Sequence, residues 1–237
     1  MTPFIPDVDA VVLDVGGVLL VPHAEPVAAA LAMMEVAVDP STAVRAHYLG
    51  VRALDEAAAP AEASRRYLEA YARALGVTED AVDLAADVLH ALWVGPSSDL
   101  WRQPVPGSQD GLRRLHATGR QLAIVSNSDG TVEGLLTAHQ ICQVGAGHGV
   151  PVCAIVDSTI VGAAKPDPHI FHALVERVGI VPERALYVGD TVRYDVLGAR
   201  AAGLHPVHFD PYDDCASRDD HPHARSLDDV ADALASR

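Results

Sequence analysis

Short apolar runs recur along most of the chain, and amphipathic segments separate them. The runs are rich in Val, Ile and Ala and are bounded by polar residues or glycine, which is typical of strands buried on both faces of a parallel sheet. They are AVVLDV at 10–15, QLAIVSN at 121–127, VCAIVDS at 152–158, ALYVGD at 185–190 and PVHFD at 206–210. We expect these segments to be the strands of one parallel sheet.

The segments between the later runs have the apolar spacing of helices and end in glycine. They are SQDGLRRLHATG at 108–119, HIFHALVERVG at 169–179 and YDVLGARAAG at 194–203. Glycine just past the last apolar position is a common helix stop, and a helix is the usual crossover between parallel strands. Strands that alternate with such helices predict the α/β class, with a doubly wound parallel sheet of Rossmann-like type.

The interval from residue 22 to residue 102 is far too long for one crossover. It is rich in alanine and has helical spacing in three stretches, 26–38, 62–76 and 79–93. We therefore expect residues 1–21 and 103–237 to form the sheet domain, and residues 22–102 to form an inserted α-helical cap domain. Both linkers of the insertion pass the carboxyl edge of the sheet, where open α/β sheets bind ligands, so we expect the insertion to act as a lid. Its aromatic residues are expected to form its own core; they are Tyr48, Tyr67, Tyr71, Trp93 and Trp101.

Charge and hydropathy narrow the class of partner. The 237 residues carry a formal net charge of −15, which repels the phosphates of nucleic acids and anionic lipid headgroups. No apolar run approaches the roughly 20 residues that cross a bilayer, and no basic segment precedes the first apolar stretch. We expect a soluble, cytoplasmic protein that acts on small molecules, with neither nucleic acid nor membrane as a partner. The sequence leaves the oligomeric state open.

The cysteines and histidines do not show a known metal-binding spacing. Cys142, Cys153 and Cys215 are odd in number and form no CxxC pair, which argues against a disulfide framework and a zinc site. Several histidines occur in the second half of the chain, but none pairs at a known spacing with a third ligand. They are His169, His172, His205, His208, His221 and His223. The sequence predicts surface or packing roles for them.

Reactive side chains follow the predicted strands at their carboxyl ends. Asp14, Ser126 and Asp190 end three of the apolar runs, and Asp195 and Lys165 lie at helix starts beside them. Of the 17 basic residues, only Lys165 is a lysine, and an ammonium is not interchangeable with a guanidinium at a tight site. Taken singly, Asp190 also suits a helix N-cap and Ser126 a turn. Together these side chains meet at one edge of a parallel sheet, as in a functional site.

In this order, the motifs LDVGGVL, AIVSNS, AAKPDP and VGDTVRYD resemble those of the haloacid dehalogenase superfamily. Each motif alone is weak, but the set of four, in order and with a helical insertion after the first, is specific. The resemblance extends over essentially the whole chain. It implies a hydrolase, in most cases a phosphatase that acts on a small phosphorylated molecule.

The resemblance also implies roles for individual residues. Asp14 is expected to be the nucleophile that forms an aspartyl-phosphate, and Lys165 is expected to neutralise developing negative charge. Ser126, the N–H of Asn127 and the N–H groups after Asp14, including that of Gly17, are expected to hold phosphate oxygens. The expected cofactor is Mg²⁺, a hard cation that prefers oxygen ligands. Its expected ligands are Asp14, the carbonyl oxygen of Gly16, Asp190 and Asp195, the last directly or through water.

Gly16 departs from the family pattern, because phosphatases of this superfamily usually have an aspartate two residues after the nucleophile. That aspartate protonates the leaving alcohol, a role worth roughly 10²–10⁴ in rate. Three interpretations stay open. The first is a phosphatase whose acid comes from elsewhere or whose leaving group needs none. The second is a metal-independent 2-haloacid dehalogenase, since halide leaves without a proton. The third is a non-catalytic protein that binds a phosphorylated ligand.

His23 offers one source of the missing acid. It lies nine residues after Asp14 on the segment LVPHAEP, between the sheet and the insertion. Two interpretations compete: an acid–base group that faces the site, and a loop histidine hydrogen-bonded to nearby backbone.

Overall fold

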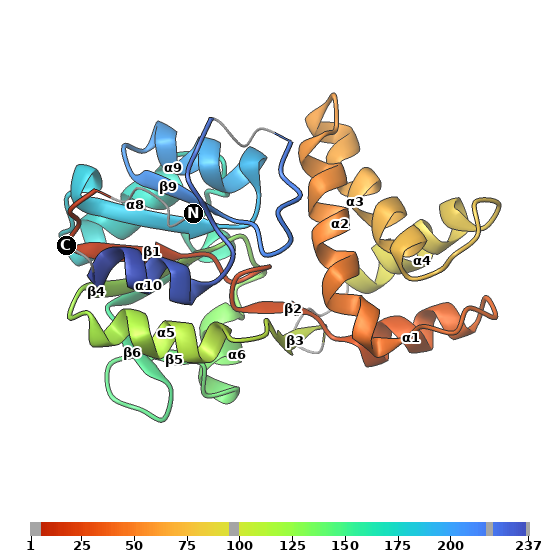
Figure 1. Cartoon of the computed structure of the whole chain (residues 1–237), viewed down its shortest axis with the longest axis horizontal. Coiled ribbons are helices and arrows are strands. Elements are labelled where there is room, and N and C mark those ends of the chain that lie inside the picture. The colour runs from red at the N-terminus through yellow and green to blue at the C-terminus, as the bar shows by residue number, and fades with distance from the viewer. Residues whose placement is uncertain (1–5, 95–99, 217–219, 236–237) are drawn as a thin grey trace. The chain divides into compact units, whose positions relative to one another are not determined.

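The computed structural model describes residues 6–94, 100–216 and 220–235. Its contacts divide the chain into two compact units. The first, here called the core unit, joins Met1–Leu19 to Pro104–Arg237, and the second, the inserted unit, is Leu20–Gln103. Figure 1 shows both in the colours of the sequence. That the inserted unit acts as a cap stays a prediction.

A six-stranded sheet with strand order β10-β9-β8-β1-β4-β7 forms the centre of the core unit. All five neighbouring pairs are parallel, which confirms the predicted α/β class and the doubly wound parallel sheet. The strands are β1 (Ala10–Leu13), β4 (Gln121–Ser126), β7 (Ala154–Asp157), β8 (Ala185–Gly189), β9 (His205–Phe209) and β10 (His223–Ala224). β1 lies at the middle of the sheet and is buried along its whole length, as its uninterrupted apolar sequence predicts.

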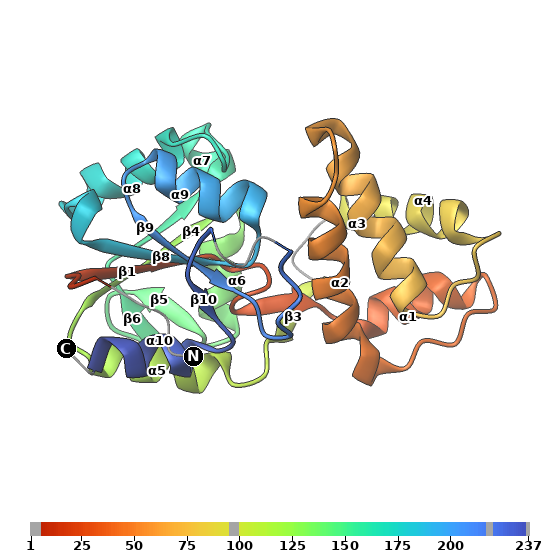
Figure 2. The same ribbon diagram turned by 45° about the horizontal axis from the view of Figure 1, so that its top comes forward.

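Helices cover both faces of this sheet. α5 and α10 lie side by side on one face, and α8 and α9 lie on the opposite face (Figure 2). The helical segments of the unit are α5 (Ser108–Ala117), α6 (Val132–Ala138), α7 (Ser158–Val161), α8 (His169–Val178), η3 (Pro182–Arg184), the π-helical turn η4 (Val192–Val196), α9 (Leu197–Ala201) and α10 (Leu227–Ala235). Phe171 on α8 packs edge-on against Tyr187 on β8, with ring centroids 5.0 Å apart, within the core between α8 and the sheet.

The tail of the chain contributes a sixth strand to the sheet. This strand, β10, extends the sheet beyond β9 with His223 opposite His208 and Ala224 opposite Phe209. Without β10, β9 would be an edge strand with unpaired backbone N–H and carbonyl groups, and the pairing supplies partners for them. Two residues are too few for a periodic pattern, so the sequence did not indicate this strand.

Two short sheets complete the strands of the described residues. β5 (Cys142–Val144) pairs in parallel with β6 (Val150–Val152). β2 (Leu20–Pro22) pairs with β3 (Trp101–Pro104) where the chain passes between the two units.

The inserted unit is helical, as expected. It contains α1 (Ala24–Ala32), the short η1 (Pro40–Thr42), α2 (Ala43–Asp55), α3 (Pro60–Ala74) and α4 (Val82–Trp93). The helix expected over 26–38 is wrong beyond Ala32, because Glu35 has φ 60° and the following stretch leads into Pro40, where a helix cannot continue. No helix within the described ranges is long and apolar enough to cross a membrane.

The core of the inserted unit is a cluster of aromatic rings, as predicted. The rings of Tyr67 and Tyr71 stack at 5.8 Å, and Trp93 packs edge-on against Tyr71 at 5.5 Å. His47 lies among them and shares a hydrogen bond of 2.9 Å between its Nδ1 and the hydroxyl of Tyr67. Burial lowers the pKa of His47 to about 3, so its ring is neutral.

Candidate active site

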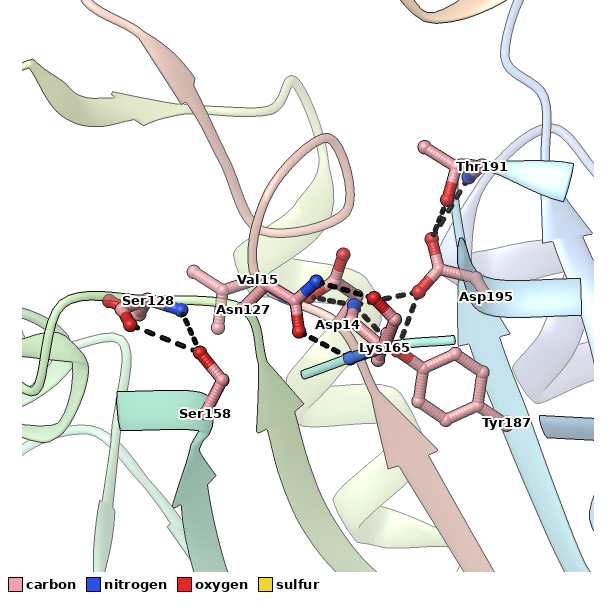
Figure 3. A network of polar contacts seen from close by, with 9 residues as sticks. All are labelled: Asp14, Val15, Asn127, Ser128, Ser158, Lys165, Tyr187, Thr191 and Asp195. Atoms are coloured by element: carbon pink, nitrogen blue, oxygen red, sulfur yellow. Dashed lines mark hydrogen bonds and ion pairs between the residues drawn. The ribbon is translucent and has the colours of Figure 1, made fainter. Parts of the chain in front are cut away.

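Four polar residues from separate parts of the core unit lie at the carboxyl edge of the sheet. Asp14 follows β1, Asp190 follows β8, and Asp195 lies on η4. Lys165 precedes α8, and its side chain extends toward Asp14 and Asp195 (Figure 3). All four residues are buried. The parallel topology brings them together, because the carboxyl ends of β1 and β8 meet at the same edge.

A tight turn follows Asp14. The backbone N–H of Asp14 still donates to Val188 on β8 at 2.9 Å, and that of Leu19 donates to the carbonyl oxygen of Val15 at 2.9 Å. Gly17 makes this turn with φ 65°, a left-handed conformation that favours glycine. Gly16 forms a single β-bridge, and its φ is not positive. A side chain at position 16 is therefore compatible with the backbone conformation.

Asn127 holds the backbone of Lys165 with both ends of its amide. Its Oδ1 accepts from the Lys165 backbone N–H at 2.7 Å, and its Nδ2 donates to the Lys165 carbonyl oxygen at 3.1 Å. The sequence suggested only the backbone N–H of Asn127 as a functional group. The side chain has a positioning role that the local sequence, a turn-rich SNSDG, did not indicate.

Every proton of the Lys165 ammonium has an acceptor. The Nζ lies 2.8 Å from Asp14 Oδ1, 2.7 Å from Asp195 Oδ1 and 3.0 Å from the hydroxyl oxygen of Tyr187. The Tyr187 hydroxyl donates in turn to Asp195 Oδ1 at 2.8 Å. An ammonium has three donors, so this arrangement sets the position of Nζ. Tyr187 was missed by sequence reasoning, and its only signal was a polar hydroxyl within the apolar run ALYVGD.

Both carboxylate oxygens of Asp195 are occupied. Oδ1 accepts from Lys165 and Tyr187, and Oδ2 accepts from the backbone N–H of Thr191 at 3.0 Å and from its hydroxyl at 2.6 Å. A carboxylate offers about four lone-pair sites, and these four bonds fill them. The geometry favours a positioning role for Asp195 over direct metal ligation.

Gly189 allows Asp195 to come this close to β8. A Cβ at position 189 would lie 2.3 Å from Asp195 Cγ and 2.4 Å from Asp195 Cβ. The glycine of VGDT is therefore required by close approach of a side chain, not by its own backbone conformation. The following turn has Thr191 and not Asp190 at its N-cap, which leaves Asp190 at the sheet edge.

The buried carboxylates of the site outnumber the ammonium that they contact. Three carboxylates, Asp14, Asp190 and Asp195, face one ammonium, and their ligand oxygens lie within 4.8 Å of one another. Burial raises the pKa of Asp14 to about 7, and burial together with the charge of Asp195 raises the pKa of Asp190. Burial also acts to raise the pKa of Asp195, but the ion pair with Lys165 and the bonds from Thr191 outweigh it, so that pKa lies below its usual range.

One divalent cation fits this deficit. With three carboxylates ionised, the cluster has a formal excess of two negative charges over Lys165. Hard oxygen donors are the ligands that Mg²⁺ prefers. Asp14 and Asp190 are the candidate direct ligands from this cluster, since Asp195 has no acceptor site to spare. The Gly16 carbonyl oxygen stays a predicted ligand.

The remaining predicted site residues lie at the same edge of the sheet. Ser126 is buried at the end of β4, in register with Asp157 of β7. Gly17 is buried in the turn after Asp14. The roles of these residues in binding phosphate stay predictions.

His23 has a local structural role. It is the N-cap of α1, and its Nδ1 accepts from the Glu25 backbone N–H at 3.3 Å, while its own N–H donates to the Leu100 carbonyl oxygen at 2.6 Å. The interpretation as a loop histidine hydrogen-bonded to nearby backbone is the one that these contacts support.

Comparison with known proteins connects this geometry to one family. A profile of haloacid dehalogenase-like hydrolases matches residues 8–203. A mouse protein, haloacid dehalogenase-like hydrolase domain-containing protein 3, is 34% identical over 109 residues, 46% of this chain and 41% of that protein. A phosphoserine phosphatase of Thermus thermophilus is 33% identical over 105 residues, 44% of this chain and 40% of that protein. The matches thus span less than half the length of these relatives.

A solved structure shares the fold over nearly the whole chain. The HAD-hydrolase YfnB of Bacillus subtilis, bound to magnesium, has a TM-score of 0.62 at 18% identity, over 97% of this chain and 99% of its own. At this identity the likeness concerns the fold alone.

Proposed function

The chain belongs to the haloacid dehalogenase-like hydrolase family, and we propose that it is a Mg²⁺-dependent phosphatase of small phosphorylated metabolites. The observation that carries the proposal is the buried carboxylate cluster with one ammonium. Such an excess of buried negative charge is costly unless a cation or protons neutralise it. A cation there offsets the charge of an incoming phosphate as well.

Asp14 has one oxygen anchored and one available for attack. Its Oδ1 accepts from the Val15 backbone N–H at 2.7 Å and lies 2.8 Å from Lys165 Nζ. Oδ2 has no such contact among the described residues. In the proposed reaction an oxygen of Asp14 bonds to phosphorus as the bond from phosphorus to the leaving oxygen breaks. Water then attacks the aspartyl-phosphate and releases inorganic phosphate.

The other groups of the site hold the phosphate and neutralise its negative charge. Lys165, fixed by Asp195, Tyr187 and the Asn127 amide, offsets charge on the transferring phosphoryl group. A bound Mg²⁺ would supply polarisation of a phosphoryl oxygen at this site. We assign Asp14, Asp190 and the Gly16 carbonyl oxygen to the cation, and Ser126, with the backbone N–H groups of Gly17 and Asn127, to the phosphate.

The similarity to a phosphoserine phosphatase supports a phosphate monoester as the class of substrate. Gly16 leaves no acid beside the nucleophile, so the leaving oxygen must take its proton from the substrate, from water or from another residue. Leaving groups that are stable as anions are favoured on this ground.

Gly16 also suits displacement of halide, which leaves without a proton, so 2-haloacid dehalogenation is the second candidate. The charge of the site argues against it. A 2-haloacid brings a carboxylate of its own to a cluster that already has three, and halide displacement in this superfamily uses no metal to offset them.

A metal-removal experiment separates the two candidates. Hydrolysis of a generic aryl phosphate is expected to require Mg²⁺ and to stop in EDTA, and 2-haloacids are expected to release no halide. Full activity in EDTA, or halide release without metal, overturns the phosphatase. A protein that binds Mg²⁺ and phosphate but never turns over identifies a non-catalytic binder.

A further inference from the structure

A second group of potential metal-ligating side chains lies on β9, on β10 and on the loop between these strands, here called the tail loop. His208 on β9 and His223 on β10 are neighbours in register, and the loop between those strands contributes Cys215 and His221. One ligand atom from each of the four lies within 4.8 Å of every other. All four belong to the core unit, and none takes part in the proposed hydrolysis.

Some ring nitrogens of this cluster are buried without a hydrogen bond among the described residues: Nδ1 of His221 and both ring nitrogens of His223. Two of these atoms face a carboxylate, since His223 Nδ1 lies 3.3 Å from Asp210 Oδ2 and His221 Nδ1 lies 3.7 Å from Asp220 Oδ2. The rings of His221 and His223 stack at 4.6 Å. His223 Nε2 therefore stays a buried polar atom without a partner in the described ranges, which in a native protein calls for an explanation such as an ion.

The separations inside the cluster match a tetrahedral zinc ion. His221 Nε2 lies 3.2 Å from His208 Nδ1 and 3.6 Å from Cys215 Sγ. A tetrahedral zinc ion bound to nitrogen at about 2.0 Å and to sulfur at about 2.3 Å separates two nitrogens by about 3.3 Å, and nitrogen from sulfur by about 3.5 Å. A hydrogen bond between His221 and His208 explains the first distance but leaves His223 Nε2 without a partner among the described residues.

Neighbouring groups orient the lone pairs toward the centre of the cluster. His208 Nε2 lies 2.8 Å from the Asp190 carbonyl oxygen, to which it donates. The neutral ring then has its lone pair on Nδ1, the atom that faces His221. His223 Nδ1 lies 3.3 Å from Asp210 Oδ2, so a proton on Nδ1 leaves Nε2 as the ligand. Carboxylate and carbonyl partners of this kind fix the tautomers of metal-binding histidines.

Asp210 also holds the loop that presents the thiol. Its Oδ1 accepts from the Asp214 backbone N–H at 2.9 Å, and its Oδ2 accepts from that of Cys215 at 3.2 Å. One carboxylate thus organises two of the four candidate ligands, and its negative charge offsets part of the charge of a bound dication.

We propose that His208, Cys215, His221 and His223 form a structural Zn²⁺ site that joins the tail loop to β9 and β10. Three imidazoles and one thiolate are a ligand set that zinc binds, and a full set of four protein ligands is typical of structural sites. None of these four residues has a role in the proposed hydrolysis. One hydrogen bond links the zinc site to the candidate active site, because His208 donates to the carbonyl oxygen of Asp190.

Metal analysis of the purified full chain tests the site. After exposure to Zn²⁺ and removal of loosely bound metal with a weak chelator, close to one equivalent of zinc is expected to remain. Cys215→Ser and His223→Asn are expected to retain at least tenfold less. The matched controls are Cys153→Ser, at an exposed cysteine, and His205→Asn. His205 lies on β9, as His208 does, but its ring donates to the Glu183 carbonyl oxygen on η3. Both controls are expected to retain zinc.

Cobalt substitution gives a second readout that does not depend on any variant. Co²⁺ in a tetrahedral site with one thiolate is expected to show strong visible absorption and a sulfur-to-cobalt charge-transfer band, even if Cys215→Ser fails to fold. The spectrum is expected to persist in Asp14→Asn, which separates this site from the hydrolytic one. A folded wild-type protein that retains no zinc, or that binds Co²⁺ without the charge-transfer band, overturns the proposal.

Discussion

The two units of the chain bury polar groups in opposite ways. The core unit buries ionised groups in contact with one another, with Lys165 between Asp14 and Asp195. The inserted unit buries aromatic rings, and His47 among them shares a hydrogen bond with the hydroxyl of Tyr67. Desolvation acts in both places, but its consequences differ, since His47 becomes neutral while Lys165 stays charged because its acidic neighbours outweigh burial.

This difference separates a site from a core. Burying charge does little for stability, and replacing a buried ion pair with apolar groups is often neutral or stabilising. Rings buried in an apolar core stabilise their unit directly. The edge of the sheet therefore holds an arrangement that folding alone does not favour, as expected where stability is lost in exchange for chemistry.

Substitution of the proposed nucleophile has the largest expected effect. It is expected to lower turnover without lowering the stability of the protein. Asp14→Asn is expected to lower turnover of an aryl phosphate on the order of 10⁴-fold or more. It removes one of three mutually repelling buried carboxylates, so the melting temperature of the metal-free protein is expected to stay level or rise. Asp167→Asn, at an exposed acid that pairs with His169, is the control for both assays. A fall in the melting temperature of Asp14→Asn that accounts for its lost activity would contradict the view that this edge is built for chemistry and not for stability.

Removal of a cation tests how much burial matters to an ion pair. Lys165→Met leaves Asp14 and Asp195 buried without their cation, at an expected cost of about 3–5 kcal/mol in unfolding free energy. Arg65 in the inserted unit contacts three acids, Glu69, Asp83 and Asp87, yet its side chain is 38% exposed.

Arg65→Met is therefore expected to cost about 1 kcal/mol or less. Urea unfolding of both variants measures the contrast. Equal losses for the two substitutions would show that exposure does not decide the value of these pairs.

An acid placed beside the nucleophile is expected to raise the turnover of substrates whose leaving group must be protonated. Gly16→Asp is expected to raise turnover of alkyl phosphates by about 10²-fold, because a positioned acid is worth roughly 10²–10⁴. Aryl phosphates are expected to gain less, since their leaving group needs little protonation. The matched variant Gly17→Asp is expected to destabilise the protein instead, because Gly17 has φ 65°. A folded Gly16→Asp protein without the gain would mean that the acid already comes from elsewhere.

The last expected effect is absent at neutral pH and appears only in acid, where it concerns the stability of the inserted unit. Burial lowers the pKa of His47 from 6.5 to about 3. Between these pH values the ring is therefore protonated in the unfolded chain and neutral in the folded protein. Stability is then complete above pH 6.5 and decreases as the pH falls toward 3, by up to about 1.4 kcal/mol per pH unit from this group. His47→Gln, which retains a partner for Tyr67, is expected to flatten the decrease. The exposed His139→Gln serves as the control, and an unchanged slope in His47→Gln would remove His47 as the cause.

Much of the fold followed from local pattern. The runs AVVLDV and ALYVGD became β1 and β8 because a strand buried on both faces must be apolar throughout. The α/β class and the family are confirmed. The family motifs also selected Asp14, Lys165, Asp190 and Asp195, which the structure brings to one edge. Their roles in catalysis stay predictions.

Other features are decided by contacts between distant segments. Tyr187 is one more apolar position of a strand until its hydroxyl meets Lys165, 22 positions away in the chain. The saturation of Asp195 depends on Gly189 leaving room for it. Neither fact has a periodic signature in the sequence.

The histidines of the tail show this limit most clearly. The spacing of His208, His221 and His223 matches no known ligand pattern and predicted surface or packing roles, and Cys215 belongs to no CxxC pair. The pairing of β10 with β9 places His223 opposite His208, and the loop between those strands returns Cys215 and His221 to the same place. The sequence by itself determined the alternation of strands and helices and the chemistry at the strand ends, because both are local. Only the tertiary structure decided which polar atoms meet, because strand register and loop closure set distances that residue spacing does not encode.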